Sequence, residues 1–282
     1  MLNSMADPDV EPAIRKHARW SLRWLDLKDS IYGKSVADLT PHEAARVRAL
    51  ADAEGLGVSC LSTVLFGGEV EVGEDEFRRA HLAPIPRVLE LAGILRPRWI
   101  RLLAAQIRVR STTPDSTRYI LDRQPWLLDA YRAAVEQIVR AGYGAVIENE
   151  VAGTIWSRPE EITSFFRALD RPAARLIWDI QNLWQMGTFP SLEVYRHLRP
   201  LIALVHVKGG MAEVPGGPLV WRSSLADATW PVIPILRAVI ADDASPVICL
   251  NPSHGKAKPG YDYTDVAERD IRFLRQNLSE IE

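Results

Sequence analysis

Short apolar runs, separated by longer amphipathic stretches, recur along the whole 282-residue chain. Most of these runs are apolar at every position instead of alternating, as expected for strands of a parallel sheet that is buried on both faces. The intervening stretches carry helix signals. The clearest is Thr40-Pro41-His42-Glu43, with a capping threonine, proline at the first helical position and glutamate in the first turn. The pattern therefore predicts repeated strand–helix units.

The predicted strands lie at residues 2–6, 23–27, 58–61, 99–103, 145–148, 175–179, 202–207 and 246–250, the first being short and weak. The predicted helices lie at residues 9–19, 40–55, 74–92, 125–141, 159–169, 191–199, 230–241 and 265–277, with a break in the third at Pro84 or Pro86. This alternation predicts an α/β protein with a single (β/α)8 TIM barrel. We expect one domain over residues 1–282, since no linker or change of composition marks a boundary. An open doubly wound sheet is the alternative, but no glycine-rich nucleotide-binding motif supports it.

Four polar residues, Glu148, Asp179, His206 and Asn251, stand at the carboxyl ends of predicted strands. The carboxyl ends of barrel strands surround the active-site mouth, so these side chains should converge there. Carboxylates and imidazole suit one divalent ion of Mn, Mg, Co or Zn, with Asn251 where a further carboxylate would complete the set. The alternatives are ordinary structural roles. Glu148 and Asp179 can cap the following loops, His206 can be a hydrogen-bonded core residue, and Asn251 can form a turn with Pro252.

A series of motifs follows the same order along the chain. They are Leu25-Asp-Leu-Lys28, Gly33-Lys-Ser-Val-Ala-Asp-Leu39, Gly55-Leu-Gly-Val-Ser-Cys-Leu-Ser62, Ile100-Arg-Leu102, Glu148-Asn149-Glu150, Asp179-Ile-Gln-Asn182 and His206-Val-Lys-Gly209. Each motif is weak by itself, but the ordered set covers nearly the whole chain. It resembles the sugar phosphate isomerase/epimerase family, whose fold is the xylose isomerase-like TIM barrel.

The resemblance implies one divalent metal ion that grips a ketose carbonyl and the neighbouring hydroxyl, while a carboxylate removes a proton from the adjacent carbon. We therefore expect an isomerase or epimerase of carbohydrate metabolism, acting on a sugar or sugar-like hydroxyketone through a metal-stabilised enediolate. Two positions depart from the family pattern. Asn251 stands where many members have a glutamate, and Glu150 stands where a histidine is frequent.

The candidate residues fall into three groups. The metal ligands are Glu148, Asp179, His206 and Asn251; the catalytic residues are Glu148, Glu150 and His254; and the substrate-binding residues are Lys28, Arg101, Lys208, Asn182 and Trp156. Arg101 is a charge inside a strand, so pairing with Glu148 or Glu150 is its structural alternative. For Lys208, the alternative is a solvated loop lysine.

Asn251 leaves the reaction type open, because an amide cannot carry a proton between substrate carbons. A metal-dependent lyase or dehydratase on the same scaffold needs only one base beside the metal. A catalytically degenerate, metal-free binding barrel is the third reading, favoured by Asn251 and Glu150 together.

The composition of the chain limits the classes of partner that we expect it to bind. A formal charge of −2 and the absence of a Lys/Arg-rich tract argue against nucleic acid, and no apolar stretch is long enough to span a membrane. The N-terminus lacks a signal-peptide core, so we expect a cytoplasmic enzyme with a small-molecule substrate; a homo-oligomer is compatible with these features. Cys60 and Cys249 lie in strand-like runs and are expected to be buried, reduced thiols.

Overall fold

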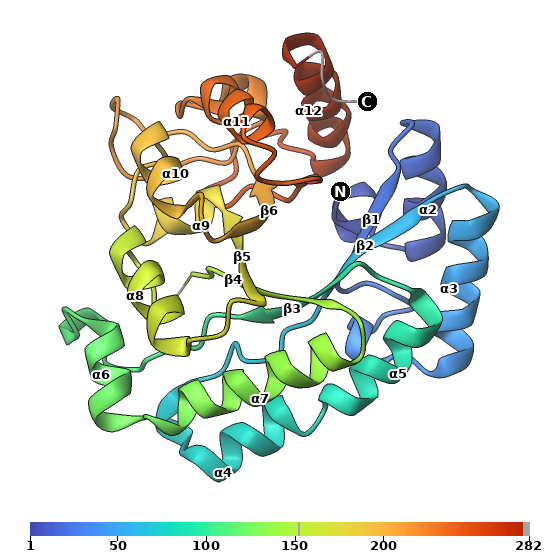
Figure 1. Cartoon of the computed structure of the whole chain (residues 1–282). Helices are drawn as coiled ribbons and strands as arrows, with labels where there is room; N and C mark the ends of the chain where they lie inside the picture. Colours follow the sequence, from blue (N-terminus) through green and yellow to red (C-terminus); the bar gives the residue numbers. More distant parts are fainter. Residues whose placement is uncertain (152, 279–282) are drawn as a thin grey trace.

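Seven parallel strands, hydrogen-bonded in sequence order, form a nearly closed barrel with helices around the outside (Figure 1). The computed structural model describes residues 1–151 and 153–278. The strands are β1 (Trp24–Leu27), β2 (Gly57–Ser62), β3 (Trp99–Leu103), β4 (Gly144–Glu148), β5 (Ala174–Asp179), β6 (Ile202–Val207) and β7 (Ile248–Leu250). This arrangement confirms the predicted TIM-barrel class.

The helices follow the strands around the ring, from blue to red in Figure 1. They are α1 (Asn3–Ala6), α2 (Val10–Arg19), α3 (Pro41–Ala53), α4 (Glu74–Phe77), α5 (Ile85–Leu95), α6 (Ser116–Arg123), α7 (Trp126–Arg140), α8 (Pro159–Leu169), α9 (Ile180–Gln185), α10 (Leu192–Leu198), α11 (Val232–Ala241) and α12 (Tyr263–Asn277). Short turns are η1 (Val36–Asp38), η2 (Val70–Val72), η3 (Arg78–Leu82), η4 (Arg110–Thr112) and η5 (Leu225–Asp227). Among the described residues, none of the helices has the length and apolar character needed to cross a membrane.

The predicted first strand, residues 2–6, is wrong. Residues Asn3–Ala6 are helical, and only Leu2 pairs with the sheet, through a parallel bridge to Asp26 and an N–H that donates to the Leu250 carbonyl at 3.1 Å. The buried Asn3 side chain explains the change, since it bonds the end of β1 at the Asp29 carbonyl and the Lys28 N–H, which a strand residue pointing outward could not do. Leu2 thus bridges the seam between β7 and β1, while the Met1 carbonyl beside it accepts the Asp26 N–H at 3.1 Å. A cavity of about 380 Å³ lies along the seam.

Two further differences concern helices. The predicted helix at residues 74–92 is broken, as its prolines implied, into α4, the π-type turn η3 and α5. Helices α6 and α9 were not predicted. α9 begins directly after β5, without an intervening loop. No turn signal in the sequence therefore separates the apolar run of the strand from the first residues of the helix.

The interior of the barrel is layered along the strand direction. Its lower part is a small apolar cluster of buried residues, separate from the main core: Cys60, Trp99, Val146, Ile177 and Leu204. Because side chains alternate between the two faces of a strand, the residue two positions later points to the same side. On β4, β5 and β6 those next inward positions are Glu148, Asp179 and His206, so the apolar layer supports a polar layer directly above it.

Asp270 of α12 gives the fold a testable pH dependence. Its buried carboxylate accepts the Leu225 N–H at 2.7 Å, and burial raises the pKa of Asp270 from 3.8 to about 7, with the bond from Leu225 opposing the rise. The carboxyl group is thus harder to ionise in the folded chain than in the unfolded chain. Its contribution to stability is complete below pH 3.8 and is lost as the pH rises through about 7.

We predict that Asp270→Asn, which cannot ionise, flattens this dependence. Between about pH 5 and about pH 8.5 the free energy of unfolding of the wild type should fall by about 3 kcal/mol more than that of the variant. Urea unfolding at both pH values measures the difference. Asp265→Asn, at an exposed carboxylate of the same helix, is the control and should behave as the wild type. Equal slopes for Asp270→Asn and the wild type would contradict the assignment.

Candidate functional site

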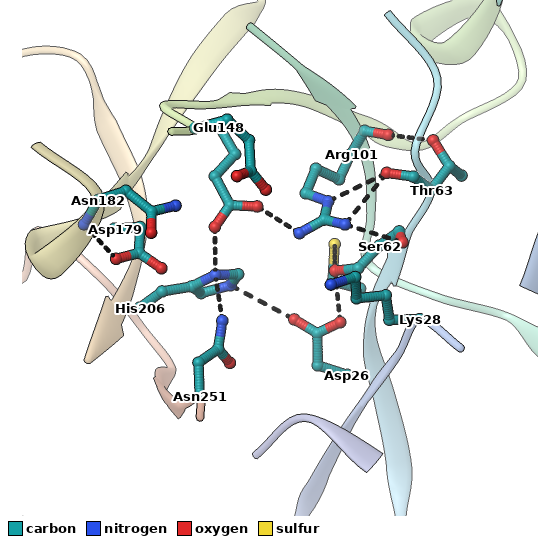
Figure 2. A network of polar contacts seen from close by, with 12 residues as sticks. Asp26, Lys28, Ser62, Thr63, Arg101, Glu148, Asp179, Asn182, His206 and Asn251 are labelled. Atoms are coloured by element: carbon teal, nitrogen blue, oxygen red, sulfur yellow. Dashed lines mark hydrogen bonds and ion pairs between the residues drawn. The ribbon is translucent and has the colours of Figure 1, made fainter. Parts of the chain in front are cut away.

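Three predicted metal ligands meet at the carboxyl-terminal mouth of the barrel. Glu148 ends β4, Asp179 ends β5 and His206 lies near the end of β6, and their ligand atoms all lie within 4.8 Å of one another. Each side chain is almost completely buried. Convergence of strand ends, which the sequence pattern implied, therefore produces a compact group of two carboxylates and one imidazole (Figure 2).

The His206 ring is contacted on both edges. Nδ1 lies 2.8 Å from Glu148 Oε1 and 3.0 Å from Asn251 Nδ2, while Nε2 lies 3.4 Å from Asp26 Oδ2 (Figure 2). Burial acts to lower the pKa of His206, but the neighbouring Glu148 and Asp26 carboxylates outweigh it and raise the pKa to about 9. The two carboxylates therefore fix the ring in orientation and favour its charged form.

Arg101 of β3 is the partner of Glu148. Its guanidinium donates to Glu148 Oε2 and to the carbonyl oxygens of Ser62 and Thr63, and both charged side chains are buried. Burial would raise the pKa of Glu148, but Arg101 and His206 hold it well below the usual range. Arg101, predicted to bind substrate or to pair with a glutamate, makes the ion pair in this structure.

Asp179 combines two functions at the start of α9. Oδ1 accepts the Asn182 N–H at 3.0 Å and caps the helix, while Oδ2 lies 2.7 Å from Lys208 Nζ. Lys208 also donates to Asn182 Oδ1 at 2.8 Å and is only 4% exposed, so it is not a solvated loop lysine. Burial raises the pKa of Asp179, and the Lys208 ammonium opposes that rise.

Two buried amides that the sequence reasoning overlooked hold the strand ends together. Asn149 bridges β4 to β5, donating to the Asp179 carbonyl and accepting the Asp179 N–H, both at 2.9 Å. Gln181 joins the loops that follow β6 and β7, because it donates to the Gly209 carbonyl and accepts the His254 N–H at 2.7 Å. Both amides follow strand ends directly, and that position was the only signal in the sequence.

Asp26 of β1 is the charged residue that the sequence reasoning missed. Besides facing His206, it accepts a short hydrogen bond of 2.5 Å from Ser62 Oγ, and only 1% of it is exposed. Burial acts to raise the pKa of Asp26, but His206, Arg101 and Ser62 together lower it. The available signal was an acidic residue inside the apolar run Leu25-Asp-Leu27, where a charge needs a partner.

Glu150 lies at the partly exposed rim of the cluster. Among the residues that the structure describes, its carboxylate has one hydrogen-bond donor, the Val151 N–H at 3.3 Å. Burial and the nearby Glu148 carboxylate raise the pKa of Glu150 above its ordinary value of 4.5. Glu150 therefore differs from Glu148, because the described residues give it fewer partners and it is partly exposed.

His254 and Lys28 also lie on this rim and are partly exposed. Burial lowers the pKa of His254 to about 3, and the positive charges of Lys208, Arg222 and Lys28 add to the effect. A neutral imidazole therefore borders this side of the mouth, near the positive charges of two lysines and an arginine.

Trp156, predicted to bind substrate, lies in the apolar core. Its side chain is completely buried, and its ring contacts those of Phe165 and Phe166 at centroid distances of 5.1 and 5.8 Å. The loop after β4 turns the ring inward toward α8, because this large apolar surface packs against two phenylalanines. A completely buried ring has no surface to offer a substrate, so the predicted substrate-binding role of Trp156 has no support in this structure.

The cluster fits a divalent ion by its chemistry. Arg101 engages Glu148 Oε2, which leaves Oε1 directed at His206 Nδ1. Asp26 lies on the far side of the ring, so Nδ1 could serve as a ligand to an ion that displaces its proton. A carboxylate behind a ligating histidine is the usual supporting partner of a metal site. Asn251 can add an amide oxygen. Lys208, now at Asp179 Oδ2, would have to share that oxygen with an ion.

The barrel and its mouth correspond to a known family. The family model described as xylose isomerase-like TIM barrel matches residues 24–276. The chain belongs to this family. Comparison of the sequence with curated proteins gave no match.

Solved structures share the fold at low sequence identity. The 3-keto-D-glucoside 4-epimerase YcjR from E. coli is 15% identical, with 98% of each chain covered and a TM-score of 0.72. A xylose isomerase-like TIM barrel protein from Mycobacterium smegmatis, in complex with magnesium, is 16% identical, with 95% of this chain and 88% of that chain covered and a TM-score of 0.69. The probable 3-DHS dehydratase AsbF from Bacillus anthracis is 14% identical, with 93% and 92% covered and a TM-score of 0.69.

We predict that the Arg101–Glu148 ion pair is required for the full stability of the folded protein. Arg101→Met leaves the Glu148 carboxylate buried without its main counter-charge, so the free energy of unfolding should fall by about 3–5 kcal/mol. Urea unfolding in the presence of chelator measures this. The double variant Arg101→Met/Glu148→Gln should recover a substantial part of the loss, since no uncompensated charge remains. A loss below about 1 kcal/mol for Arg101→Met would show that water or another group replaces the guanidinium.

Proposed function

We propose that this protein is a divalent-metal-dependent isomerase or epimerase of a sugar or sugar-like hydroxyketone. One observation carries the proposal: Glu148, Asp179 and His206 meet within 4.8 Å at the mouth of a xylose isomerase-like barrel. A sugar epimerase and a magnesium complex among the structures with this fold are consistent with it. The substrate is expected to be a small molecule.

The ligands of the ion would be Glu148, Asp179, His206 and the Asn251 amide oxygen. When bound there, a divalent ion supplies Lewis-acid polarisation of a substrate carbonyl, which makes the neighbouring C–H bond more acidic. The chain prepares the site in two ways. Arg101 holds Glu148 in place, and Asp26 holds the ring of His206 so that Nδ1 faces the mouth.

Glu150 is the better of the two candidate bases. Both oxygens of Glu148 are occupied, by Arg101 and by His206, whereas Glu150 receives one long hydrogen bond from the described part of the chain and is partly exposed. A carboxylate with few partners is free to take a proton from the carbon next to a carbonyl and to return it. Lys28 at the rim can bind a substrate oxygen, and His254, held neutral, can donate a hydrogen bond to a hydroxyl.

A dehydratase or lyase is the second candidate, and Asn251 is the observation that favours it. An epimerase commonly needs a proton donor or acceptor on each face of the planar intermediate, and the amide of Asn251 cannot serve one face at any pH. Elimination needs a single base. Glu150 would remove the proton beside the carbonyl and pass it to the departing β-hydroxyl, which leaves as water. A probable dehydratase shares this fold.

We predict that metal binding depends on the three converging donors. Glu148→Ala, Asp179→Ala and His206→Ala should each reduce the Mn²⁺ content of the purified protein sharply, as measured by elemental analysis after supplementation with the metal and desalting. Glu160→Ala, at an exposed carboxylate at the start of α8, is the control and should keep the wild-type content. Wild-type protein that binds no metal after supplementation and shows no turnover would instead support a metal-free binding barrel.

We also predict that one carboxylate carries the chemistry. Glu150→Gln should lower the turnover of an accepted ketose by about 10²- to 10⁴-fold, as expected for loss of a general base, while Asn251→Asp should keep much of the activity. The assay mixes enzyme with a panel of ketopentoses, ketohexoses and their acids in deuterated water, and follows products by NMR. Deuterium in an inverted stereocentre identifies an epimerase, and an unsaturated product identifies a dehydratase. Full activity of Glu150→Gln would show that Glu150 is not the base and would leave Glu148 as the candidate.

A further inference from the structure

A second group of ligand atoms lies on the opposite edge of the His206 ring. Asp26 of β1, His206 of β6 and Cys249 of β7 offer ligand atoms that all lie within 4.8 Å of one another. All three side chains are at least 97% buried. None of the proposed roles at the mouth uses Cys249, which is one of only two cysteines in the chain.

The fold explains why these residues meet. His206 and Cys249 are register partners on neighbouring parallel strands, so their side chains point to the same face of the sheet. Asp26 reaches them across the seam, where only Leu2 separates β7 from β1. A thiol, an imidazole and a carboxylate are thereby enclosed together at the level of the polar layer, on the β7–β1 side of the His206 ring.

The spacing of these atoms matches a tetrahedral site. Asp26 Oδ2 lies 3.4 Å from His206 Nε2 and 3.6 Å from Cys249 Sγ. Zinc bonds of about 2.0 Å to nitrogen or oxygen and about 2.3 Å to sulfur place tetrahedral ligand atoms roughly 3.3–3.5 Å apart. Asn251 Oδ1, 3.4 Å from the same sulfur, stands where a fourth oxygen ligand would be. These three separations are close to those of a tetrahedral zinc site, and the ligand atoms of His206 and Cys249 lie within 4.8 Å of each other.

We propose that Asp26, His206 and Cys249 form a binding site for a thiophilic divalent ion of the Zn²⁺ or Co²⁺ class, separate from the oxygen-rich group at the mouth. The thiolate sets the preference, because soft sulfur ligands select zinc-like ions over Mg²⁺ and Mn²⁺. The site needs neither Glu148 nor Asp179, so it does not depend on the proposed reaction. It shares the ring of His206 with the mouth, through Nε2 instead of Nδ1, and the single amide oxygen of Asn251 can complete only one of the two ligand sets.

The experiment is a titration of the metal-free protein with Co²⁺, followed by the near-ultraviolet charge-transfer band of a cobalt–thiolate bond. We expect Co²⁺ to produce the band in the wild type, whether or not a second equivalent fills the mouth, and Zn²⁺ to abolish it by displacement. Cys249→Ala should remove the band. Cys60→Ala is the matched control and should retain it, because Cys60 is equally buried but its sulfur contacts Ser62 and is in no group with a histidine.

Two results would overturn the proposal: no charge-transfer band in wild-type protein that has bound Co²⁺, or a band that persists in Cys249→Ala. Circular dichroism checks that each variant is folded. If Cys249→Ala does not fold, X-ray absorption at the zinc edge of the loaded Cys60→Ala protein decides, since a sulfur neighbour at about 2.3 Å is then Cys249 and its absence refutes the site. Mn²⁺ content, measured in parallel, reports on the mouth separately, so the two proposals can fail independently.

Discussion

Charge compensation inside the barrel is the constraint on which the mouth depends. A carboxylate removed from water is costly unless a positive charge and hydrogen bonds accompany it. Each of three buried acids has such a partner: Arg101 for Glu148, Lys208 for Asp179, and the His206 ring for Asp26. Because the partners come from different strands, the ion pairs also fix how the strand ends sit against one another. The apolar layer below supplies stability, and the paired charges specify the geometry.

The part of the site that follows from strand periodicity could be predicted from the sequence. Glu148, Asp179 and His206 end or nearly end apolar runs, and any closed parallel barrel brings such positions together. The same reasoning located the helices that follow clear caps, as in the capping box of Thr40 and Glu43 at α3. The strand-end residues and the capped helices follow from the local sequence pattern and from closure of the sheet. They could therefore be predicted without knowing which distant residues are in contact.

The remaining features depend on pairings between distant residues. In the sequence, Asp26 looks like an ordinary polar residue within a strand. Only the structure shows that it contacts His206, which lies 180 positions later in the chain. Trp156 looked like a pocket residue because it follows a strand end, but the loop turns it toward Phe165. The prediction of a first strand was wrong for another reason. The strand tendency of the short run at residues 2–6 is weaker than the stabilisation from the hydrogen bonds that the Asn3 side chain makes when those residues are helical.

The closure at Leu2 has a consequence for the order in which the chain can fold. The hydrogen bond from the Leu2 N–H to the Leu250 carbonyl joins residues 248 positions apart (250 minus 2), so it forms at the greatest loop-closure cost in the sheet. Until β7 is in place, β1 and the growing opposite edge are both unpaired strand edges, open to pairing with other chains. In the last step of assembly, the small unit that docks between the two edges is Leu2 with the short helix α1 that follows it. The barrel thus behaves during folding as an open parallel sheet, and becomes a ring only when the two ends of the sequence meet.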